Sequence, residues 1–471
     1  MNEEQNARYL GEEKVSALVW RFSVPCVLSM LLSYLYSVVD QIFVGNSELS
    51  TLGNAAVGVV FPLFVIAQAV AWCLGDGCAA YLNICQGQGR GKDATRAIGS
   101  GILVTVLLGL MMVAVGFPLR DWLLSTFGAS ENTIGYAREY FNIVVPFFPV
   151  YMLFNMLNGV IRADGSPNWS MISVVAGAVV NLILDPIFIF RMHWGMTGAA
   201  WATVIGQTVS LCLSIYYFMV KHSRTFRLTR SSFRISPRHL GAAVRLGIPS
   251  FVIQMTVVVV SLLSNMMLAR YGAQSRYGAD IPVAIFGIQN KVYSLVVNLP
   301  IGIALGCQPI VSYNIGARKI KRVKQAYKLI LLSTLAIGAA VTLLFQLAPE
   351  LIVGLFGYPT NIPNPEDYWE FGAKTFRIFL GLILLSGYVR MTAIFLQSAG
   401  APVRSMAATT VRDIVCFVPL VVLLPRAFGV EGVLYAGPIA DLVAAVVAAL
   451  MTALLLRRLG RLESKEPAAQ G

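Results

Sequence analysis

Charged residues are scarce in this sequence, and their scarcity excludes an ordinary soluble domain. Only 13% of the 471 residues are Asp, Glu, Lys or Arg, whereas soluble domains carry roughly 25%. Hydrophobic residues make up 57% of the chain, and the mean hydropathy is +0.70. A bilayer requires apolar runs of about 20 residues, which few soluble cores need. The composition therefore predicts a membrane protein.

The sequence also lacks the motifs of common enzyme and cofactor sites. Its seven cysteines form no CxxC pair, and its three histidines, His193, His222 and His239, fall in loops without zinc-ligand spacing. No HExxH, GxSxG or Walker loop occurs. These absences argue against a membrane-embedded enzyme and against direct use of ATP, and they predict no metal and no cofactor. The acidic start MNEEQNARYLGEEK argues against a cleavable signal peptide.

Long apolar runs dominate the chain, and their number predicts an all-α membrane protein with twelve transmembrane helices. Several runs exceed the length that a bilayer needs, so these helices can tilt or bend. Prolines within the runs are tolerated because neighbouring helices can satisfy the carbonyls that proline leaves free. The predicted spans are residues 17–44, 54–84, 96–119, 137–160, 168–190, 197–220, 243–270, 281–312, 326–348, 373–397, 404–426 and 431–456.

The positive charges of the loops predict the orientation of the spans. With the amino terminus inside, 25 of the 36 Lys and Arg residues fall on the inner side and 8 on the outer side. This bias follows the positive-inside rule, so we expect a cell-membrane protein with both termini in the cytoplasm. The net charge of +13 then serves contact with anionic lipids of the bilayer rather than binding of nucleic acid.

The two halves of the sequence resemble each other, which predicts a duplicated bundle of six helices. Because each half begins inside and crosses six times, the halves would be parallel repeats related by a pseudo-two-fold axis along the membrane normal. Two such lobes around a central cleft are typical of an alternating-access transporter. The matching stretches are RFSVPCVL at 21–28 with RLGIPSFV at 245–252, VIRADGSP at 160–167 with FLQSAGAP at 395–402, and GMTGAAWATVIGQ at 195–207 with GVEGVLYAGPIAD at 429–441.

This repeat predicts how the chain is divided. Each lobe contains six spans, and the most basic stretch joins them. The predicted parts are a cytoplasmic segment 1–16, a first lobe 17–220, a basic cytoplasmic linker 221–242, a second lobe 243–456 and a cytoplasmic tail 457–471.

Polar residues on three spans of the first lobe share one depth in the membrane. Counted at about 1.5 Å per residue, Asp40, Asp185 and Thr203 all lie in the outer half. Asn181 and Tyr36 lie one helical turn before the two acids, on the same helix faces. Two carboxylates with amide, phenol and hydroxyl groups can hold one proton between them or coordinate one Na⁺, and intramembrane acids indicate function by default. The alternatives are a helix-end Asp40 that reaches water and an Asp185 that only shapes the following turn.

At these residues the sequence resembles the multidrug and toxic compound extrusion (MATE) family over nearly its whole length. The resemblance implies a two-lobe, twelve-helix antiporter that expels lipophilic, often cationic compounds in exchange for H⁺ or Na⁺. It also implies an ion site in the first lobe, made by Asp40, Asn181 and Asp185 and completed by Tyr36 and Thr203. The matching motifs are LYSVVDQIFVG, GVIRADGSPNWSMISVVAGAVVNLILDPIFIF, GMTGAAWAT and GIALGCQPIVSYNIGARK.

Spans 7 and 10 lack the acids that form a second ion site in some members of that family, a Glu on span 7 and an Asp on span 10. Here these spans read LGIPSFVIQMTVVVVSLL and FLGLILLSGYVRMTAIF. We therefore expect coupling through the first lobe, with H⁺ and Na⁺ both open as the coupling ion. Neutralising the acid pair would let span 1 repack, with Pro25 as the hinge.

The second lobe has charges of its own near the middle of the membrane. Lys291, Arg412, Asp413 and Asp441 share a depth, so the two cations are expected to pair with the two acids. Such pairs either hold helices together or act as a substrate anchor or conformational latch. Arg390 lies nearer the cytoplasmic end, where we expect its side chain to reach the interface.

Uncharged polar residues within the spans bear on the substrate. They either form hydrogen bonds between helices or face the cleft, where aromatic residues and Met suit bulky amphipathic compounds. We expect small, lipophilic, cationic substrates and a monomer as the working unit. The polar residues assigned to the cleft are Asn155, Gln254 and Gln289.

The leading hypothesis is a secondary active multidrug exporter that exchanges a cation for drug by alternating access of two lobes. The alternative is a flippase for lipids or lipid-linked oligosaccharides, which can use the same kind of duplicated bundle. A flippase requires several basic residues in its cleft, and Lys291, Arg390 and Arg412 are the candidates. A channel is a third possibility, which strict counterflow would exclude.

Overall fold

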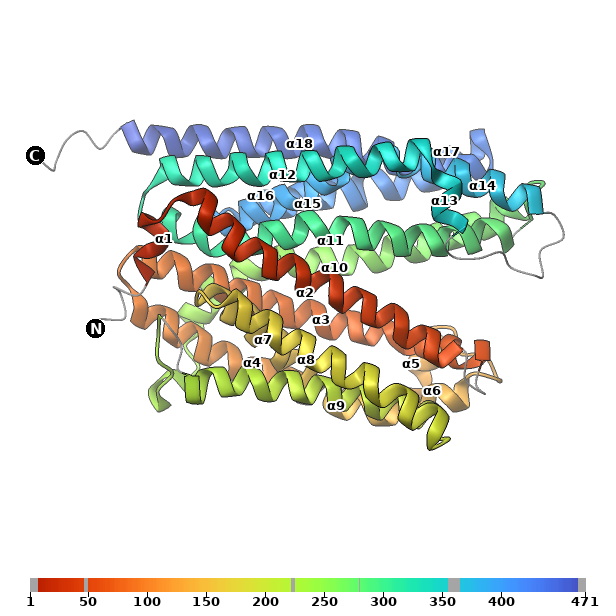
Figure 1. The fold of residues 1–471 in the computed structure, drawn as a ribbon, viewed down its shortest axis with the longest axis horizontal. Coiled ribbons are helices and arrows are strands. Elements are labelled where there is room, and N and C mark those ends of the chain that lie inside the picture. Colours follow the sequence, from red (N-terminus) through yellow and green to blue (C-terminus); the bar gives the residue numbers. More distant parts are fainter. Residues whose placement is uncertain (1–6, 46–49, 222–224, 279, 355–364, 465–471) are drawn as a thin grey trace, which may run out of the picture.

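The structure is a computed structural model that describes residues 7–45, 50–221, 225–278, 280–354 and 365–464 (Figure 1). These residues form helices and the turns between them. Eleven helices are long and apolar enough to cross a membrane, and one bent pair supplies a twelfth span. The prediction of an all-α protein with twelve spans is therefore confirmed. The outer parts of the two predicted tails, and His222 in the predicted linker, lie outside the described residues.

The first half of the chain forms a short helix followed by a bundle, which we call the first lobe (α2 to α9). Pro149 and Pro167 stand in the first turns of α7 and α8, where a missing N–H costs no hydrogen bond. The elements are α1 (Tyr9–Glu12), α2 (Val15–Gly45), α3 (Ser50–Gly87), α4 (Gly91–Gly116), α5 (Arg120–Thr126), α6 (Ile134–Val144), η2 (Val145–Phe147), α7 (Phe148–Ala163), α8 (Pro167–Pro186), η3 (Ile187–Arg191), α9 (Gly195–Tyr216) and η4 (Tyr217–Lys221).

The second half forms a similar bundle, which we call the second lobe (α10 to α18). It is preceded by one short turn of helix. The elements are η5 (Arg230–Phe233), α10 (Pro237–Gly272), α11 (Asp280–Gly316), α12 (Ile320–Leu347), α13 (Pro349–Gly354), α14 (Pro365–Ile378), α15 (Ile383–Ser398), α16 (Pro402–Thr410), η6 (Val411–Phe417), α17 (Val418–Phe428) and α18 (Val430–Ser464).

A glycine–proline turn recurs at the same place in both lobes. Between α7 and α8, Gly165 has φ +82° and Pro167 begins the next helix. Between α15 and α16, Gly400 has φ +74° and Pro402 does the same. Glycine suits the left-handed conformation after a helix, and proline suits the first turn of a helix. The matching stretches at 160–167 and 395–402 therefore build the same local structure.

The tenth span differs from the prediction, because it is bent by 47° between α14 and α15. The chain turns at residues 379–382, where Gly381 approaches its own preceding turn; a Cβ at this position would lie 2.6 Å from the carbonyl oxygen of Arg377. No proline stands between residues 366 and 401. Apolar length alone could not reveal this bend, since it predicts one continuous span over 373–397.

The two ends of the bundle differ in the segments that they carry. Helix α1 and the last turns of α18 lie at one end, which we call the terminal end (Figure 1). Helices α5 and α13 lie at the opposite end, which we call the distal end. The lobes meet along a seam in which α3 packs against α10, and α2 against α11.

Glycines bring the two lobes into backbone contact in the terminal half of this seam. A Cβ on Gly302 would lie 2.9 Å from the Cα of Val27, and one on Gly306 would lie 2.6 Å from the Cα of Ser23. A Cβ on Gly247 would overlap the carbonyl oxygen of Cys73. Only glycine permits helices to approach this closely. The lobes are therefore tightly closed toward the terminal end.

Nearer the distal end, the same helices have open space beside their glycines. No atom lies within 4 Å of a Cβ built on Gly58 of α3 or on Gly287 of α11. At 3.6 residues per turn, Gly58 is on the helix face of Gly87, which packs closely against Gly316 of α11. The faces that touch near the terminal end are thus separated near the distal end. We call the space beside Gly58 and Gly287 the distal cleft.

Candidate functional site

The candidate site of the first lobe is built on the distal parts of α2 and α8. Asp40 lies on α2, and Asp185, which is 0% exposed, lies on α8. The two carboxyl groups are within hydrogen-bonding reach of each other. Since a carboxylate only accepts hydrogen bonds, a bond between them requires one proton. Oδ1 of Asp40 is buried and has no hydrogen-bond partner among the described residues.

Asn181 and Thr203 orient Asp185. With its amide turned to satisfy both neighbours, Asn181 donates from Nδ2 to Oδ2 of Asp185 at 3.2 Å and accepts from the backbone N–H of Thr203 at 3.3 Å. A Cβ on Gly206 of α9 would lie 3.0 Å from the Cβ of Asn181. The close packing of α8 on α9 therefore fixes the amide beside the acid.

Two tyrosines complete this group. Tyr36, one turn before Asp40, interacts with both acids. Tyr140 of α6 interacts with the same two acids, and its hydroxyl forms a hydrogen bond with the side chain of Thr203. The structure thus brings all five predicted residues together and adds Tyr140, which the sequence analysis missed. Tyr140 lies near the distal end of span 4, so the depth argument applied to that span could have found it.

The chemistry of this site follows from its ligand set. It offers carboxyl, amide, phenol and hydroxyl groups, and the described residues place no Lys, Arg or His against the two acids. No group of three His, Cys, Asp or Glu residues that could hold a metal ion occurs in the described part of the chain. A proton shared by the acids, or one monovalent cation with oxygen ligands, fits this arrangement.

The charges of the second lobe form a buried chain of ion pairs. Arg412 donates from Nε to Oδ1 of Asp441 and from Nη1 to Oδ1 of Asp413, both at 2.6 Å. Nη2 of Arg390 lies 3.2 Å from Oδ2 of Asp413, which also accepts from Thr256 at 2.7 Å. The π-helical segment η6 places the neighbours Arg412 and Asp413 together inside the lobe. Two Arg and two Asp side chains therefore neutralise one another.

Two sequence predictions about these charges are wrong. Lys291 is exposed and forms no ion pair with Asp413 or Asp441 in the described part of the chain, because Arg390 and Arg412 occupy those acids. Arg390 does not reach the interface: it is only 5% exposed and its guanidinium lies inside the lobe. A shared depth places residues at one level of the membrane but does not say which way each helix face points.

The uncharged polar residues assigned to the cleft divide into two groups. Asn155 accepts a hydrogen bond from Trp72 at 3.3 Å within the first lobe, and Gln254 donates to Gln68 at 3.0 Å across the seam. Gln289 is 0% exposed, and neither of its polar atoms has a hydrogen-bond partner among the described residues. It therefore lies inside the second lobe and not on a cleft surface. Pro25 lies within the continuous helix α2.

A polar network crosses the seam between the lobes, and sequence reasoning missed it. Asp76 of α3 pairs with Arg162 of α7 at 3.2 Å and accepts a hydrogen bond from Ser250 of α10 at 2.9 Å. Gln397 of α15 donates to Ser250 at 3.0 Å, and Gln308 of α11 donates to the backbone carbonyl of Asp76 at 3.2 Å. Asp76, an acid inside the predicted span 54–84, was the feature of the sequence that could have indicated this network. These bonds link the lobes where their glycines are in close contact.

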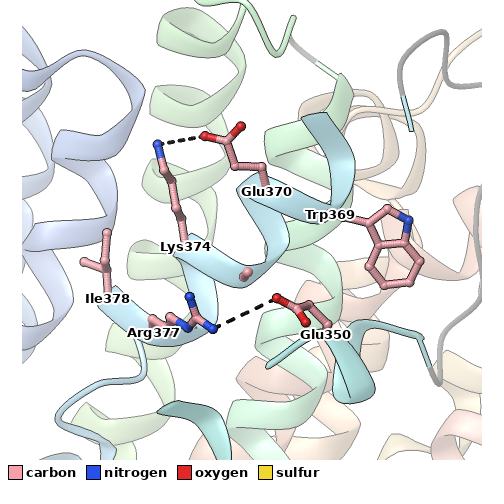
Figure 2. A pocket seen from close by; sticks show the side chains of 7 residues that line it. Glu350, Trp369, Glu370, Lys374, Arg377 and Ile378 are labelled. Carbon is pink, nitrogen blue, oxygen red and sulfur yellow. Dashed lines mark ion pairs between the residues drawn. The ribbon is translucent and has the colours of Figure 1, made fainter. Parts of the chain in front are cut away.

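A separate cavity of about 500 Å³ lies beside α14 in the second lobe (Figure 2). Its charged groups are paired: Lys374 Nζ lies 3.2 Å from Glu370 Oε1, and Arg377 Nη2 lies 4.0 Å from Glu350 Oε1. It contains none of the predicted site residues. The lining residues are Glu350, Trp369, Glu370, Ala373, Lys374, Arg377 and Ile378.

Nearly the whole chain is similar in sequence to known proteins. The family model MatE matches residues 25–187 and 249–423. The multidrug export protein MepA of Staphylococcus haemolyticus (strain JCSC1435) is 27% identical over 452 residues, which is 96% of this chain and 96% of MepA.

Two solved structures share the fold. One is a MOP superfamily transporter from Pyrococcus furiosus Vc1 (DSM3638), described as having a binding pocket of reverse polarity; it has a TM-score of 0.89 and 24% identity, with 97% of this chain and 98% of that chain covered. The other is an outward-facing multidrug resistance MATE family transporter, with a TM-score of 0.88 and 24% identity over 98% of this chain and 99% of that chain.

Twelve spans in two lobes, together with a family model that matches both lobes, identify a multi-pass membrane transporter rather than an enzyme. The family match covers more than half of the chain. The chain belongs to the MatE family.

Proposed function

We propose that the protein is a secondary active multidrug exporter in which H⁺ or Na⁺ binding at Asp40 and Asp185 drives efflux. One observation carries this proposal. Asp76, Asp413 and Asp441 pair with Arg side chains, whereas Asp40 and Asp185 face only each other and neutral groups. Asp185 is buried and Asp40 is half-buried, and two such acids without a positive partner require a proton or a cation to be stable.

The MepA relatives support export as the direction of transport, since each is described as a multidrug export protein. The loop charges support a cell-membrane location with the terminal end in the cytoplasm. In that orientation the distal cleft opens to the outside. The acid pair, on the distal parts of α2 and α8, then lies on the side from which the driving cation arrives.

The proposed cycle uses the acid pair as a switch. When Asp40 and Asp185 share one proton, the pair keeps one negative charge. A cation that binds from outside neutralises this charge, which removes the cost of holding it inside the lobe. Helix α2 then repacks, with Pro25 as the hinge, and the lobes rock about the linker at 221–242 so that the terminal end opens. Loss of the cation to the cytoplasm allows substrate to bind there and to be carried out. The protein acts as a monomer that exchanges lipophilic small molecules for the cation.

A transport assay tests this function. The purified protein is placed in proteoliposomes with a fluorescent lipophilic compound, and efflux is measured under an imposed pH gradient or Na⁺ gradient. We expect efflux to require one of the two gradients and to disappear in Asp40→Asn and Asp185→Asn. Full gradient-driven efflux by Asp185→Asn would overturn the coupling role.

Asp121→Asn is the matched control, because Asp121 is an acid in the first turn of α5, at the distal end and away from the pair. Hydrogen bonds from Arg120 and Arg138 hold the pKa of Asp121 below its usual value, so this carboxylate does not change charge under a pH gradient near neutrality. We expect the efflux rate of this variant to equal that of the parent.

The flippase alternative makes a different prediction. It requires several basic residues along the cleft, but Arg390 and Arg412 are buried in ion pairs. No efflux under either gradient, from protein shown to be folded, would favour a lipid-linked substrate over the exporter.

A further inference from the structure

Lys291 is an exposed charged residue in the interior of α11. The residues of α11 that are exposed, among those described, are Ala284, Gly287 and Lys291, which form a single stripe along the helix. Lys291 is eleven residues from the start of α11, about 16 Å from the distal end at 1.5 Å per residue. The ammonium group is therefore carried deep into the membrane region rather than at a helix end.

The helical phase of α11 shows which way this stripe points. Gly302 and Gly306 of the same helix pack against Val27 and Ser23 of α2, so their face is directed at the first lobe. Lys291 precedes Gly302 by eleven residues, which is three helical turns to within about 20°. Lys291 thus lies on the face that is directed at the first lobe. It is nearer the distal end than the glycines at which the lobes come into contact. It belongs to the distal cleft.

The charge of Lys291 is not balanced by an acid in this cleft. Within the described residues, it is the one exposed charged side chain that stands ten or more residues from both ends of its helix. Asp76, Asp413 and Asp441 are bonded to Arg side chains, and Asp40 and Asp185 face each other. The cleft therefore presents a positive charge without an acidic partner among the described residues.

We propose that Lys291 is a specificity-determining residue that receives the anionic group of an amphipathic substrate, a carboxylate in the simplest case. This inference rests on the proposed function, because it concerns the substrate that the exporter carries. When the lobes close over the cleft, the ammonium group loses water, and an anion on the substrate compensates that loss. The apolar body of the substrate then contacts the surrounding helices. This substrate class differs from the lipophilic cationic compounds expected from the sequence.

Two dyes that differ in one group test this inference. Rhodamine 110 carries a free carboxylate, and rhodamine 123 is its methyl ester with the same aromatic body. Binding of each dye to the detergent-purified full chain is measured by fluorescence anisotropy, without any ion gradient. We expect the parent to bind rhodamine 110 about tenfold more tightly than rhodamine 123, the ratio that one charge-assisted contact provides.

Variants at this position separate charge from shape. We expect Lys291→Met to abolish the preference for the acid dye, Lys291→Arg to keep it, and Lys291→Glu to reverse it in favour of the ester. Lys328→Met, which removes an exposed Lys from the terminal half of α12, is the control for net charge and should keep the parental preference.

The parent itself can overturn the inference without any variant. Equal binding of the two dyes, tighter binding of the ester, or no binding of the acid dye would do so, as would a preference that survives Lys291→Met. Because the assay uses no gradient, loss of gradient-driven efflux with an intact dye preference would count against the coupling role of Asp40 and Asp185 and not against Lys291.

Discussion

The buried acids of this protein differ at the scale of single residues in what neutralises them. Asp413 pairs with Arg390 and Arg412, Asp441 pairs with Arg412, and these four side chains balance one another. Asp40 and Asp185 have hydroxyl and amide neighbours instead, which can orient a proton or a cation but cannot replace its charge. The proposed ion coupling therefore belongs to the first lobe.

Tyr140 gives a residue-scale prediction about this site. Tyr140→Phe removes the hydroxyl that bonds Thr203 beside the acid pair, and the loss of one hydrogen bond to such a group costs about 1 kcal/mol. We expect about a fivefold change in the external H⁺ or Na⁺ concentration that gives half-maximal efflux. Tyr136→Phe, one turn earlier on α6, is the control and should leave that concentration unchanged. An identical ion dependence in both variants would contradict the place of Tyr140 in the site.

Arg412 gives a second prediction, about stability. Arg412→Leu leaves Asp441 without its partner inside the lobe, and breaking a buried ion pair by removing one partner costs about 3–5 kcal/mol. We expect a clear fall in the thermal unfolding temperature of the purified protein in detergent. Lys291→Met removes a cation of the same lobe that has no ion pair in the described chain, and we expect a change within about 0.5 kcal/mol. Equal effects of the two variants would contradict a structural role for the ion-pair chain.

At the scale of elements, glycines decide where helices of different lobes can touch. Gly247 of α10 and Gly302 of α11 permit backbone contact near the terminal end, and the Asp76 network adds hydrogen bonds at the same level. Gly58 of α3 lies beside open space near the distal end. The same helices therefore form a closed seam at one end and a cleft at the other.

Gly247→Ala tests this seam. Its Cβ would overlap the carbonyl oxygen of Cys73, and overpacking of this kind costs about 1–3 kcal/mol in the closed arrangement. We expect the population to shift toward a state that is open at the terminal end, seen as longer distances between spin labels placed on α3 and α10 at that end. Gly58→Ala adds a methyl group in open space and should leave the distances unchanged. Unchanged distances in Gly247→Ala would show that the seam does not control the conformation.

At the scale of the whole molecule, the features that the bilayer dictates were predictable from the sequence. Apolar length gave the twelve spans, and the repeated Gly-x-Pro turns at 165–167 and 400–402 indicated the duplication. The depth of each residue along its span was enough to predict that Asp40 and Asp185 lie close together.

Rotation about the helix axis was not predictable in the same way. Lys291 and Tyr293 are two residues apart, yet Tyr293 bonds Ser386 inside the lobe at 2.7 Å, and Lys291 lies on the cleft face. Contacts between distant segments were missed for a related reason. Asp76 and Ser250 are 174 residues apart, and only the packing of α3 on α10 brings them together. The bend at 379–382 could not be predicted from a proline, because no proline lies near it.

Ion movement driven by the substrate itself tests whether transport is coupled to a cation at Asp40 and Asp185. Proteoliposomes are prepared without an ion gradient, an outward or inward substrate gradient is imposed, and lumenal pH and Na⁺ are recorded. We expect substrate flux to drive one of the two ions in the opposite direction, and we expect Asp40→Asn and Asp185→Asn to abolish this ion movement. Substrate flux without movement of either ion, or unchanged ion movement in Asp185→Asn, would contradict it.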